Sequence, residues 1–268
     1  MVAEKYAPDL DSICYVIGTE VPIPGGETET IDTLQVTSPE RLDRTIETHM
    51  QAFKEKNLQA ALSRIVSVVV QPGVDFSHTA VTQYSKSSAK KLVDQLSKYK
   101  DIAFEAHSTD YQQTAGLANL VEDHHLFLKV GPELTFALRE ALFLLAKIED
   151  ELFQDKASNL IQVVFKTMDN NPKDWINYYH GSSDEQQFLK HYSYSDRIRY
   201  YWDHPDVNSA INKMIKNLDI VDIPEFVISQ FFGIATNEQN NETARSLINS
   251  RIQYVVGRYY NACGLAKW

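Results

Sequence analysis

The sequence predicts an α/β fold in its first part and a region of helices alone in its second. Before residue 155, short apolar runs alternate with loops and amphipathic stretches at helical spacing. Beyond residue 155, the helical spacing continues but no strand alternation is seen. A strand–loop–helix order favours parallel strands that are joined by right-handed crossovers. We therefore place one unit at residues 1–155 and expect a helical region, residues 156–268, packed on it.

The strands and helices of the first part are marked by local signals. Gly18 ends the first apolar run, and Pro72 with Gly73 ends the second. Ser38 and Pro39 have the residue types of an N-cap and a first helical position. The predicted units are strand 13–17 with helix 39–57, strand 65–70 with helix 85–99, strand 101–107 with a helix ending near 123, and strand 126–130 with helix 133–153. Such a four-stranded sheet leaves two edges whose backbone groups need a partner.

The second part is predicted to contain six helical stretches. It is rich in tyrosine and tryptophan, including the run RIRYYW at residues 197–202. In this acidic chain we interpret that run as packing or a subunit contact, not as a nucleic-acid site. The predicted helical stretches are residues 158–169, 172–179, 184–192, 195–202, 205–217 and 241–262.

Composition excludes several classes of protein. The net charge of −10 over 268 residues argues against a nucleic-acid partner, because such proteins concentrate Lys and Arg. The two cysteines, Cys14 and Cys263, are too few for a disulfide framework. No secretory signal pattern is visible, and Arg139 with Glu140 interrupts the most apolar helix, which argues against a membrane span. We expect a soluble cytoplasmic protein with no membrane partner.

His107 is the sharpest candidate for chemistry. It follows an apolar strand, and Glu105 lies two residues earlier, so both side chains are expected on the same face. Glu20 after the first strand and His78 after the second are further candidate ligands. Either could join His107 in a mixed nitrogen and oxygen site for zinc or another divalent cation, although neither spacing is a recognised local metal signature. A hydrogen-bonded structural histidine is the alternative at position 107. The pair His124-His125 precedes a strand, and we interpret it as structural.

Lys129 and Gly131 form a candidate phosphate-binding junction. They end the fourth strand and lead into a helix, whose N-terminus favours anions. Pro132 lacks an N–H and so removes one possible donor. No GxxxxGK[ST] motif is present, so a P-loop phosphotransferase is not predicted.

Five sequence blocks resemble one family in their order and content. That family is the non-catalytic (Z-type) subunit of class II D-tagatose-bisphosphate aldolase. The resemblance covers nearly the whole chain. The blocks are YVIGTEVPIPGGE at residues 15–27, VVQPGVDFSH at 69–78, EAHSTDYQ at 105–112, LKVGPELTFALREA at 128–141 and YSDRIRYYW at 194–202.

The resemblance implies a TIM (β/α)8 barrel, of which this chain is similar to the C-terminal part. The four predicted strands would be about the fifth to the eighth, so that residues 1–155 form a partial barrel. Blocks of the GGDHLGP and HLDAS types, which the family carries earlier, are not found. They include the Asp-His pair that corresponds to a proton-transfer acid and a metal ligand in catalytic relatives. Independent aldol cleavage is therefore not expected of this chain.

The residues that follow the predicted strands lead to the same expectation, that this chain does not cleave the substrate alone. His107 resembles the metal-binding histidine of the seventh strand in catalytic relatives. Ser108 to Asp110 replace the glycine-rich phosphate loop that should follow it, and Lys129 to Gly131 stand where those relatives have an Asn-containing loop. His78 does not align clearly with the histidine of the sixth strand, so no site of three histidines is assembled.

The resemblance implies an accessory, non-catalytic subunit that supports a separate catalytic aldolase subunit. The expected pathways are tagatose, galactitol and N-acetylgalactosamine breakdown. Two alternatives remain: a metal-dependent sugar-bisphosphate aldolase in its own right, and a tagatose-6-phosphate kinase, a label that older descriptions give to the family. The catalytic subunit is the expected partner, with a homo-oligomer as the other assembly considered.

Overall fold

A computed structural model describes residues 2–19, 34–233 and 243–265 of the chain. The chain divides into two units, Met1–Gly131 with Tyr259–Trp268, and Pro132–Arg258. The first unit contains α1 (Val2–Tyr6), β1 (Tyr15–Ile17), α2 (Pro39–Glu55), η2 (Gln59–Arg64), β2 (Ile65–Val70), β3 (Asp75–Phe76), β4 (Val81–Thr82), α3 (Lys86–Leu96), β5 (Ala103–Ala106), α4 (Thr114–Glu122) and β6 (His125–Leu128).

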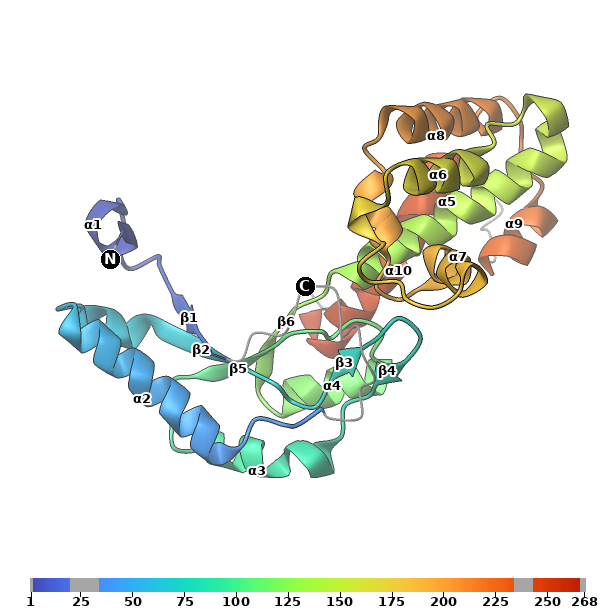
Figure 1. Ribbon diagram of the computed structural model, residues 1–268. Coiled ribbons are helices and arrows are strands. Elements are labelled where there is room, and N and C mark those ends of the chain that lie inside the picture. The colour runs from blue at the N-terminus through green and yellow to red at the C-terminus, as the bar shows by residue number, and fades with distance from the viewer. Residues whose placement is uncertain (1, 20–33, 234–242, 266–268) are drawn as a thin grey trace. The chain divides into compact units, whose positions relative to one another are not determined.

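The first unit is built on a parallel four-stranded sheet in the order β1-β2-β5-β6 (Figure 1). Val69 of β2 pairs with Glu105 of β5, and Glu105 pairs in turn with Phe127 of β6. The four strands and the helix after each of the first three lie where the sequence predicts them, which confirms the α/β fold with parallel strands. Because parallel strands end at one edge, this register brings the C-terminal ends of β5 and β6 together.

Helices α2 and α3 cover one face of the sheet with apolar side chains. Ser38 caps α2, its hydroxyl accepting from the Arg41 N–H at 3.3 Å, and Pro39 begins the helix as predicted. The core shared by these helices and the strands contains Ile17, Leu42, Ile46, Ile65, Val68, Val70, Leu92, Leu96 and Phe104. The 3.6-residue spacing of the apolar positions in the sequence predicts this face.

The antiparallel hairpin β3–β4 was not predicted. Asp75 pairs with Thr82, and Phe76 pairs with Val81. The turn is closed by the Ser77 N–H, which donates to the Ala80 carbonyl at 2.8 Å. Strands of two residues are too short to show a period of two, so the pattern carried no signal for this hairpin.

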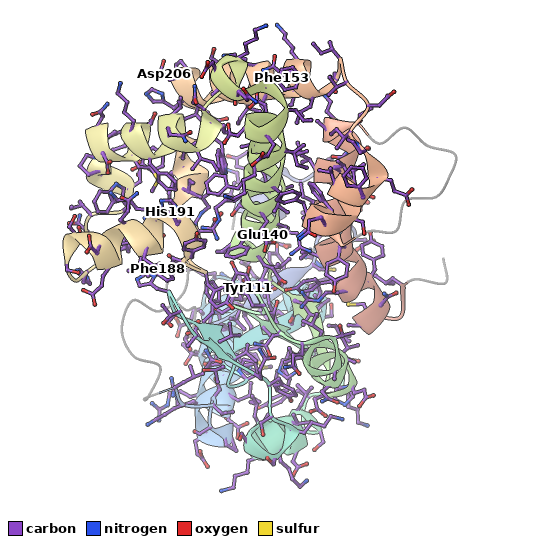
Figure 2. All side chains as sticks on the ribbon, turned by 90° about the vertical axis from the view of Figure 1, so that its right-hand side faces the viewer. Tyr111, Glu140, Phe153, Phe188, His191 and Asp206 are labelled. Atoms are coloured by element: carbon purple, nitrogen blue, oxygen red, sulfur yellow. The ribbon has the colours of Figure 1, made fainter. Side chains whose placement is uncertain are left out.

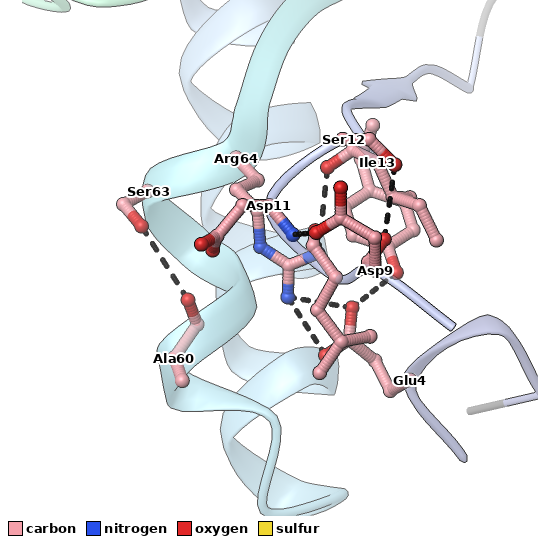
Figure 3. A network of polar contacts seen from close by, with 10 residues as sticks. Glu4, Asp9, Asp11, Ser12, Ile13, Ala60, Ser63 and Arg64 are labelled. Atoms are coloured by element: carbon pink, nitrogen blue, oxygen red, sulfur yellow. Dashed lines mark hydrogen bonds and ion pairs between the residues drawn. The ribbon is translucent and has the colours of Figure 1, made fainter. Parts of the chain in front are cut away.

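The N-terminal helix α1 is held by Arg64, the last residue of η2, directly before β2 (Figure 3). The guanidinium donates to both carboxylate oxygens of Glu4 at 2.7 Å and to the Leu10 carbonyl at 2.8 Å. Tyr15 donates its hydroxyl to the same carboxylate. The hydrogen bonds from Arg64, followed by that from Tyr15, lower the pKa of Glu4 below its ordinary value.

Gly18 lies where β1 approaches β2 closely. A Cβ at this position would stand 2.7 Å from the Val69 Cβ and 2.9 Å from its Cγ2. We expect Gly18→Ala to lower the free energy of unfolding by about 2 kcal/mol, because both strands must shift. Gly131→Ala is the matched control, since a Cβ there meets no atom within 4 Å. Equal denaturant midpoints for the two variants would contradict this packing.

The second unit is helical, as the sequence predicts. It contains α5 (Pro132–Phe153), η3 (Gln154–Lys156), α6 (Leu160–Asn170), η4 (Pro172–Asp174), α7 (Ser183–Tyr192), η5 (Arg197–Tyr201), α8 (Pro205–Leu218), α9 (Glu225–Phe232) and most of α10 (Ala244–Ala262). Its core includes Leu145, Val164, Met168, Met214 and Leu247. None of the helices in the described ranges is long and apolar enough to cross a membrane.

Three details of the second unit differ from the sequence analysis. The expected helix 172–179 is only the short turn η4, because Trp175 leaves the helical region with φ at −130°. The helix α9 was missed. The expected boundary near residue 155 falls inside this unit, since α5 packs against α6, α8 and α9. The packing of the helical region on the first unit stays a prediction.

Candidate functional site

The candidate site lies where β5 and β6 end. Glu105 accepts a hydrogen bond from the His107 Nε2 at 2.8 Å, and the Lys129 Nζ lies 3.4 Å from the same carboxylate oxygen. The Glu105 side chain is 6% exposed, that of His107 22% and that of Lys129 59%. Glu105 and His107 therefore share one face of β5, as the two-residue spacing predicts. A buried carboxylate between an imidazole and an ammonium group is the central feature of this site.

The contact with Glu105 determines which ring nitrogen of His107 carries the proton. A carboxylate accepts hydrogen bonds, so Nε2 is the nitrogen that donates to Glu105. In the neutral imidazole, Nδ1 then carries the free lone pair. A carboxylate that orients a histidine in this way is common behind metal-ligating histidines. His107 can thus act as a ligand or a base only through Nδ1.

The loop after β5 is tied to the end of β6. The backbone N–H and the hydroxyl of Thr109 both donate to the Lys129 carbonyl, at 3.2 and 2.7 Å. Ser108 and Tyr111 have positive φ angles of 53° and 62°, which non-glycine residues adopt rarely. The Tyr259 hydroxyl donates to the Thr109 carbonyl at 2.9 Å. The hydrogen bonds made by Thr109 to Lys129 and by Tyr259 to Thr109 therefore fix the backbone of this loop.

The predicted phosphate junction is engaged by a carboxylate. The Gly131 N–H donates to the Oδ1 of Asp110 at 2.9 Å, and Asp110 is buried. Lys129 lies beside Glu105, as described above. A phosphate at this junction would have to displace Asp110 or approach beside it. Phosphate binding by Lys129 and Gly131 stays a prediction.

The other predicted metal ligands are Glu20 and His78. Glu20 lies outside the described residues, and His78 lies in the β3–β4 hairpin. The described residues contain no group of three or more His, Cys, Asp or Glu side chains that could hold a metal ion. The metal site of His107 with Glu20 also stays a prediction.

The histidine pair 124–125 lies at the opposite end of the sheet from this site. His125 begins β6, is fully buried and contacts the Tyr84 and Phe104 rings with centroids 5.8 and 5.0 Å away. Burial lowers the pKa of His125 to about 4, although its hydrogen bond to the Leu120 carbonyl acts in the other direction. These contacts agree with the structural interpretation of this pair.

A cavity of about 870 Å³ lies at the N-terminal ends of the strands. Its lining includes Val66 of β2, Ala103 of β5 and Leu126 of β6, with Tyr99 and Ile102 before β5. In open α/β sheets, ligands bind beyond the carboxyl ends of the strands. We therefore assign the candidate site to the Glu105 cluster and not to this cavity.

Two parts of the site were not foreseen from the sequence. Asp110 was noted only as part of the segment that replaces a glycine-rich loop, and its role toward Gly131 was missed. Glu105 was expected beside His107, but its proximity to Lys129 was not predicted. The available signals in the sequence are an acid early in the loop after a strand, Asp110, and a glycine directly before a helix, Gly131.

Comparison with known proteins gives a consistent match. Residues 1–264 match the family described as D-tagatose-1,6-bisphosphate aldolase subunit GatZ/KbaZ-like. The crystal structure of a probable tagatose 6-phosphate kinase from Sinorhizobium meliloti 1021 is similar at 42% identity and a TM-score of 0.85, over 93% of this chain. The chain spans 62% of the length of that protein.

A second solved structure is far less similar. It is a glycerol complex of the fructuronate-tagaturonate epimerase UxaE from Cohnella laeviribosi, at 11% identity and a TM-score of 0.39. The match covers 98% of this chain and 48% of that protein. At this level the likeness carries no argument about fold or function.

Proposed function

Because this chain belongs to the D-tagatose-1,6-bisphosphate aldolase subunit GatZ/KbaZ-like family, we propose that it is a non-catalytic accessory subunit of that aldolase. In this role it raises the activity and stability of a separate catalytic subunit. The complete enzyme splits the sugar bisphosphate into glycerone phosphate and glyceraldehyde 3-phosphate. The catalytic subunit is the proposed partner.

The observation that carries this proposal is the internal pairing at the strand ends. The Glu105 carboxylate contacts His107 and Lys129, and the Asp110 carboxylate contacts the Gly131 N–H. The Glu105 carboxylate and the Gly131 N–H, which could help to hold a metal ion or a phosphate, are thus engaged within the chain, while Nδ1 of His107 keeps its lone pair. Hydrogen bonds and ion pairs to carboxylates of this kind stabilise the loops after β5 and β6. They favour a supporting role over catalysis.

We propose further that β1, β2, β5 and β6 are the fifth to eighth strands of a (β/α)8 barrel. The parallel order of the strands and the helices that follow β1, β2 and β5 support this assignment. In such a barrel the C-terminal strand ends, with His107 and Lys129, belong to the face where active sites lie. The proposed location is the cytoplasm, and the proposed pathways are tagatose, galactitol and N-acetylgalactosamine breakdown.

Mixing experiments test the accessory role. We expect the catalytic subunit to gain several-fold in cleavage rate and to unfold at a higher temperature when this chain is added, because a bound partner stabilises the folded state. A coupled assay of glycerone phosphate release and a thermal shift series measure the two effects. The chain alone serves as the blank. An unchanged rate and an unchanged melting temperature would rule the accessory role out for this chain.

A metal-dependent aldolase is the second candidate, and the Glu105–His107 contact favours it. That contact directs Nδ1 of His107 away from the carboxylate, as in histidines that ligate zinc. Among the described residues, however, His107 and Glu105 do not reach the three protein ligands of a catalytic zinc site. Bound zinc with EDTA-sensitive cleavage by the purified chain would establish this candidate. A metal-free, inert chain would exclude it.

The kinase candidate rests on the Sinorhizobium meliloti protein, which is described as a probable tagatose 6-phosphate kinase. Incubation of the purified chain with ATP and tagatose 6-phosphate tests it. Formation of the bisphosphate would support a kinase, and its absence with intact ATP would exclude one. A homo-oligomer is proposed as the other assembly, for which light scattering is the measurement.

A further inference from the structure

The last turn of α10 belongs to the first unit, although the helix begins in the second. Residues 244–258 fall in the second unit, and Tyr259 is the first residue of the helix that falls in the first. The Cys263 N–H donates to the Tyr259 carbonyl at 2.9 Å, and Gly264 then ends the turn with φ at 69°. The Tyr259 side chain is buried, so its hydroxyl needs a partner within the protein.

The Tyr259 hydroxyl binds the loop that follows β5. It donates to the Thr109 carbonyl at 2.9 Å, across 150 residues of sequence. Thr109 is fully buried, and its N–H and its hydroxyl both donate to the Lys129 carbonyl. Each polar group of Thr109 therefore has a partner, and the partner of its carbonyl comes from α10. Loss of the Tyr259 hydroxyl removes that partner from a buried oxygen, which is unfavourable.

The loop depends on such bonds because its backbone is unfavourable in isolation. Ser108 and Tyr111, on either side of Thr109, have φ angles of 53° and 62°. Serine and tyrosine rarely adopt this left-handed conformation, and it persists only where surrounding contacts hold it. Tyr111, labelled in Figure 2, has its ring against that of Phe76, with centroids 5.3 Å apart. The Ser108 end of the loop is held through Thr109 and therefore through α10.

The same bonds position the side chains of the candidate site. His107 lies two residues before Thr109, and Lys129 is the residue whose carbonyl Thr109 binds. Both side chains meet at one carboxylate oxygen of Glu105, which lies 2.8 Å from the His107 Nε2 and 3.4 Å from the Lys129 Nζ. Hydrogen bonds weaken steeply with distance and angle, so a displaced loop separates these groups. The geometry of this cluster thus depends on a bond that α10 makes.

We propose that the last turn of α10 is a latch on the candidate site and that Tyr259 is its positioning residue. The Tyr259 hydroxyl fixes Thr109, and Thr109 fixes Lys129 directly after β6. His107 and Lys129 are then held on Glu105, and Nδ1 of His107 keeps one orientation. This inference rests on the supporting role proposed for the strand ends, and it adds the helix that holds them.

Hydrogen exchange and proton NMR of the whole chain test the latch. Tyr259→Phe removes only the hydroxyl. We expect the Thr109 amide of this variant to exchange about tenfold faster, because the loop opens more often. The imidazole N–H signal of His107 is protected while Nε2 donates to the buried carboxylate, and it should broaden in the variant. A loss of stability that leaves the site intact does not broaden this signal.

Tyr99→Phe is the matched control. The Tyr99 hydroxyl also donates at 2.9 Å, in this case to Asp43. Tyr99 precedes β5, whereas Thr109 follows it, so the two lie at opposite ends of that strand. The control variant loses a hydrogen bond of the same kind in the same unit. It should leave the Thr109 amide and the His107 signal unchanged.

Thr109→Val reaches the latch from the loop. It removes the hydroxyl bond to the Lys129 carbonyl and keeps the Tyr259 hydroxyl. We expect it to broaden the same His107 signal. This variant decides between the outcomes if Tyr259→Phe does not fold.

Each outcome supports or overturns the latch. Faster exchange at Thr109 together with a broadened His107 signal, in Tyr259→Phe but not in Tyr99→Phe, supports it. Equal changes in both variants would show a general loss of stability and overturn it. An unchanged His107 signal beside faster exchange at Thr109 would overturn it as well, because α10 would then hold the loop and not the site. The mixing experiments test the accessory role separately, since no catalytic subunit is present here.

Discussion

Replacing Arg139 by methionine is expected to lower the free energy of unfolding by about 3–5 kcal/mol, because the buried Asp196 carboxylate loses its counter-charge. Arg139 is 2% exposed and Asp196 fully buried. The Arg139 guanidinium also stacks over the Phe136 ring at 4.1 Å, a contact that methionine partly keeps. Chemical denaturation measures the loss, and Lys147→Met on the exposed side of α5 is the control.

The pH dependence of this variant separates charge from packing. Burial raises the pKa of Asp196, while Arg139 and the Thr135 hydroxyl act to lower it. Removing Arg139 therefore raises that pKa further. A carboxyl group whose pKa is raised on folding stabilises the folded state fully at pH values below its unfolded pKa. This contribution is lost as the pH rises through its folded pKa. The deficit of Arg139→Met should thus shrink toward acid pH.

A double variant provides the second check on the Arg139–Asp196 pair. Asp196→Asn removes the buried charge, and asparagine tolerates the left-handed backbone. Arg139→Met with Asp196→Asn should then lose less stability than the sum of the two single losses. If the two losses in free energy of unfolding are additive and do not depend on pH, packing alone accounts for them. The ion pair would then contribute nothing.

Acid destabilisation of the first unit by about 3 kcal/mol is expected from His125 alone, since its pKa falls from 6.5 to about 4 on folding. The unfolded chain binds the proton more tightly, so stability is fully present above the unfolded pKa. It is lost as the pH falls through the window between these two values. From about pH 7.5 to about pH 5 we expect a loss of about 2 kcal/mol.

The comparison of two histidine variants isolates this effect. His125→Gln removes the titrating ring and should flatten the slope of unfolding free energy against pH in this window. His180→Gln, the same substitution at an exposed histidine, is the control against which this flattening is measured. The Nε2 of His125 has no hydrogen-bond partner among the described residues, so a proton on it would find no acceptor, in agreement with the lowered pKa. Equal slopes for the two variants would contradict the buried, neutral state of His125.

Much of the fold could be predicted because its signals are local. Apolar runs that end at Gly18 and before Pro72 and Gly73 mark strand ends, and Ser38 with Pro39 marks a helix start. The boundary near 155 and the helix 172–179 could not be obtained in this way. They depend on how α5 and Trp175 pack within the second unit, which no local pattern reports.

The candidate site was predictable only along a single strand. The spacing of Glu105 and His107 placed both side chains on one face, and the 2.8 Å contact follows from that geometry. Lys129 and Asp110 come to the site from different segments. Their contacts with Glu105 and Gly131 depend on the register of β5 with β6, which sequence spacing does not define.

The sequence by itself determined the family, the parallel α/β part and the helical part, because periodicity and motif order are properties of the chain. Only the tertiary structure decided which charged and polar groups meet. It placed Lys129 beside Glu105 and the Gly131 N–H on the Asp110 carboxylate. The physical reason is that charge pairing acts over a few ångströms in space, where residues distant in sequence become neighbours.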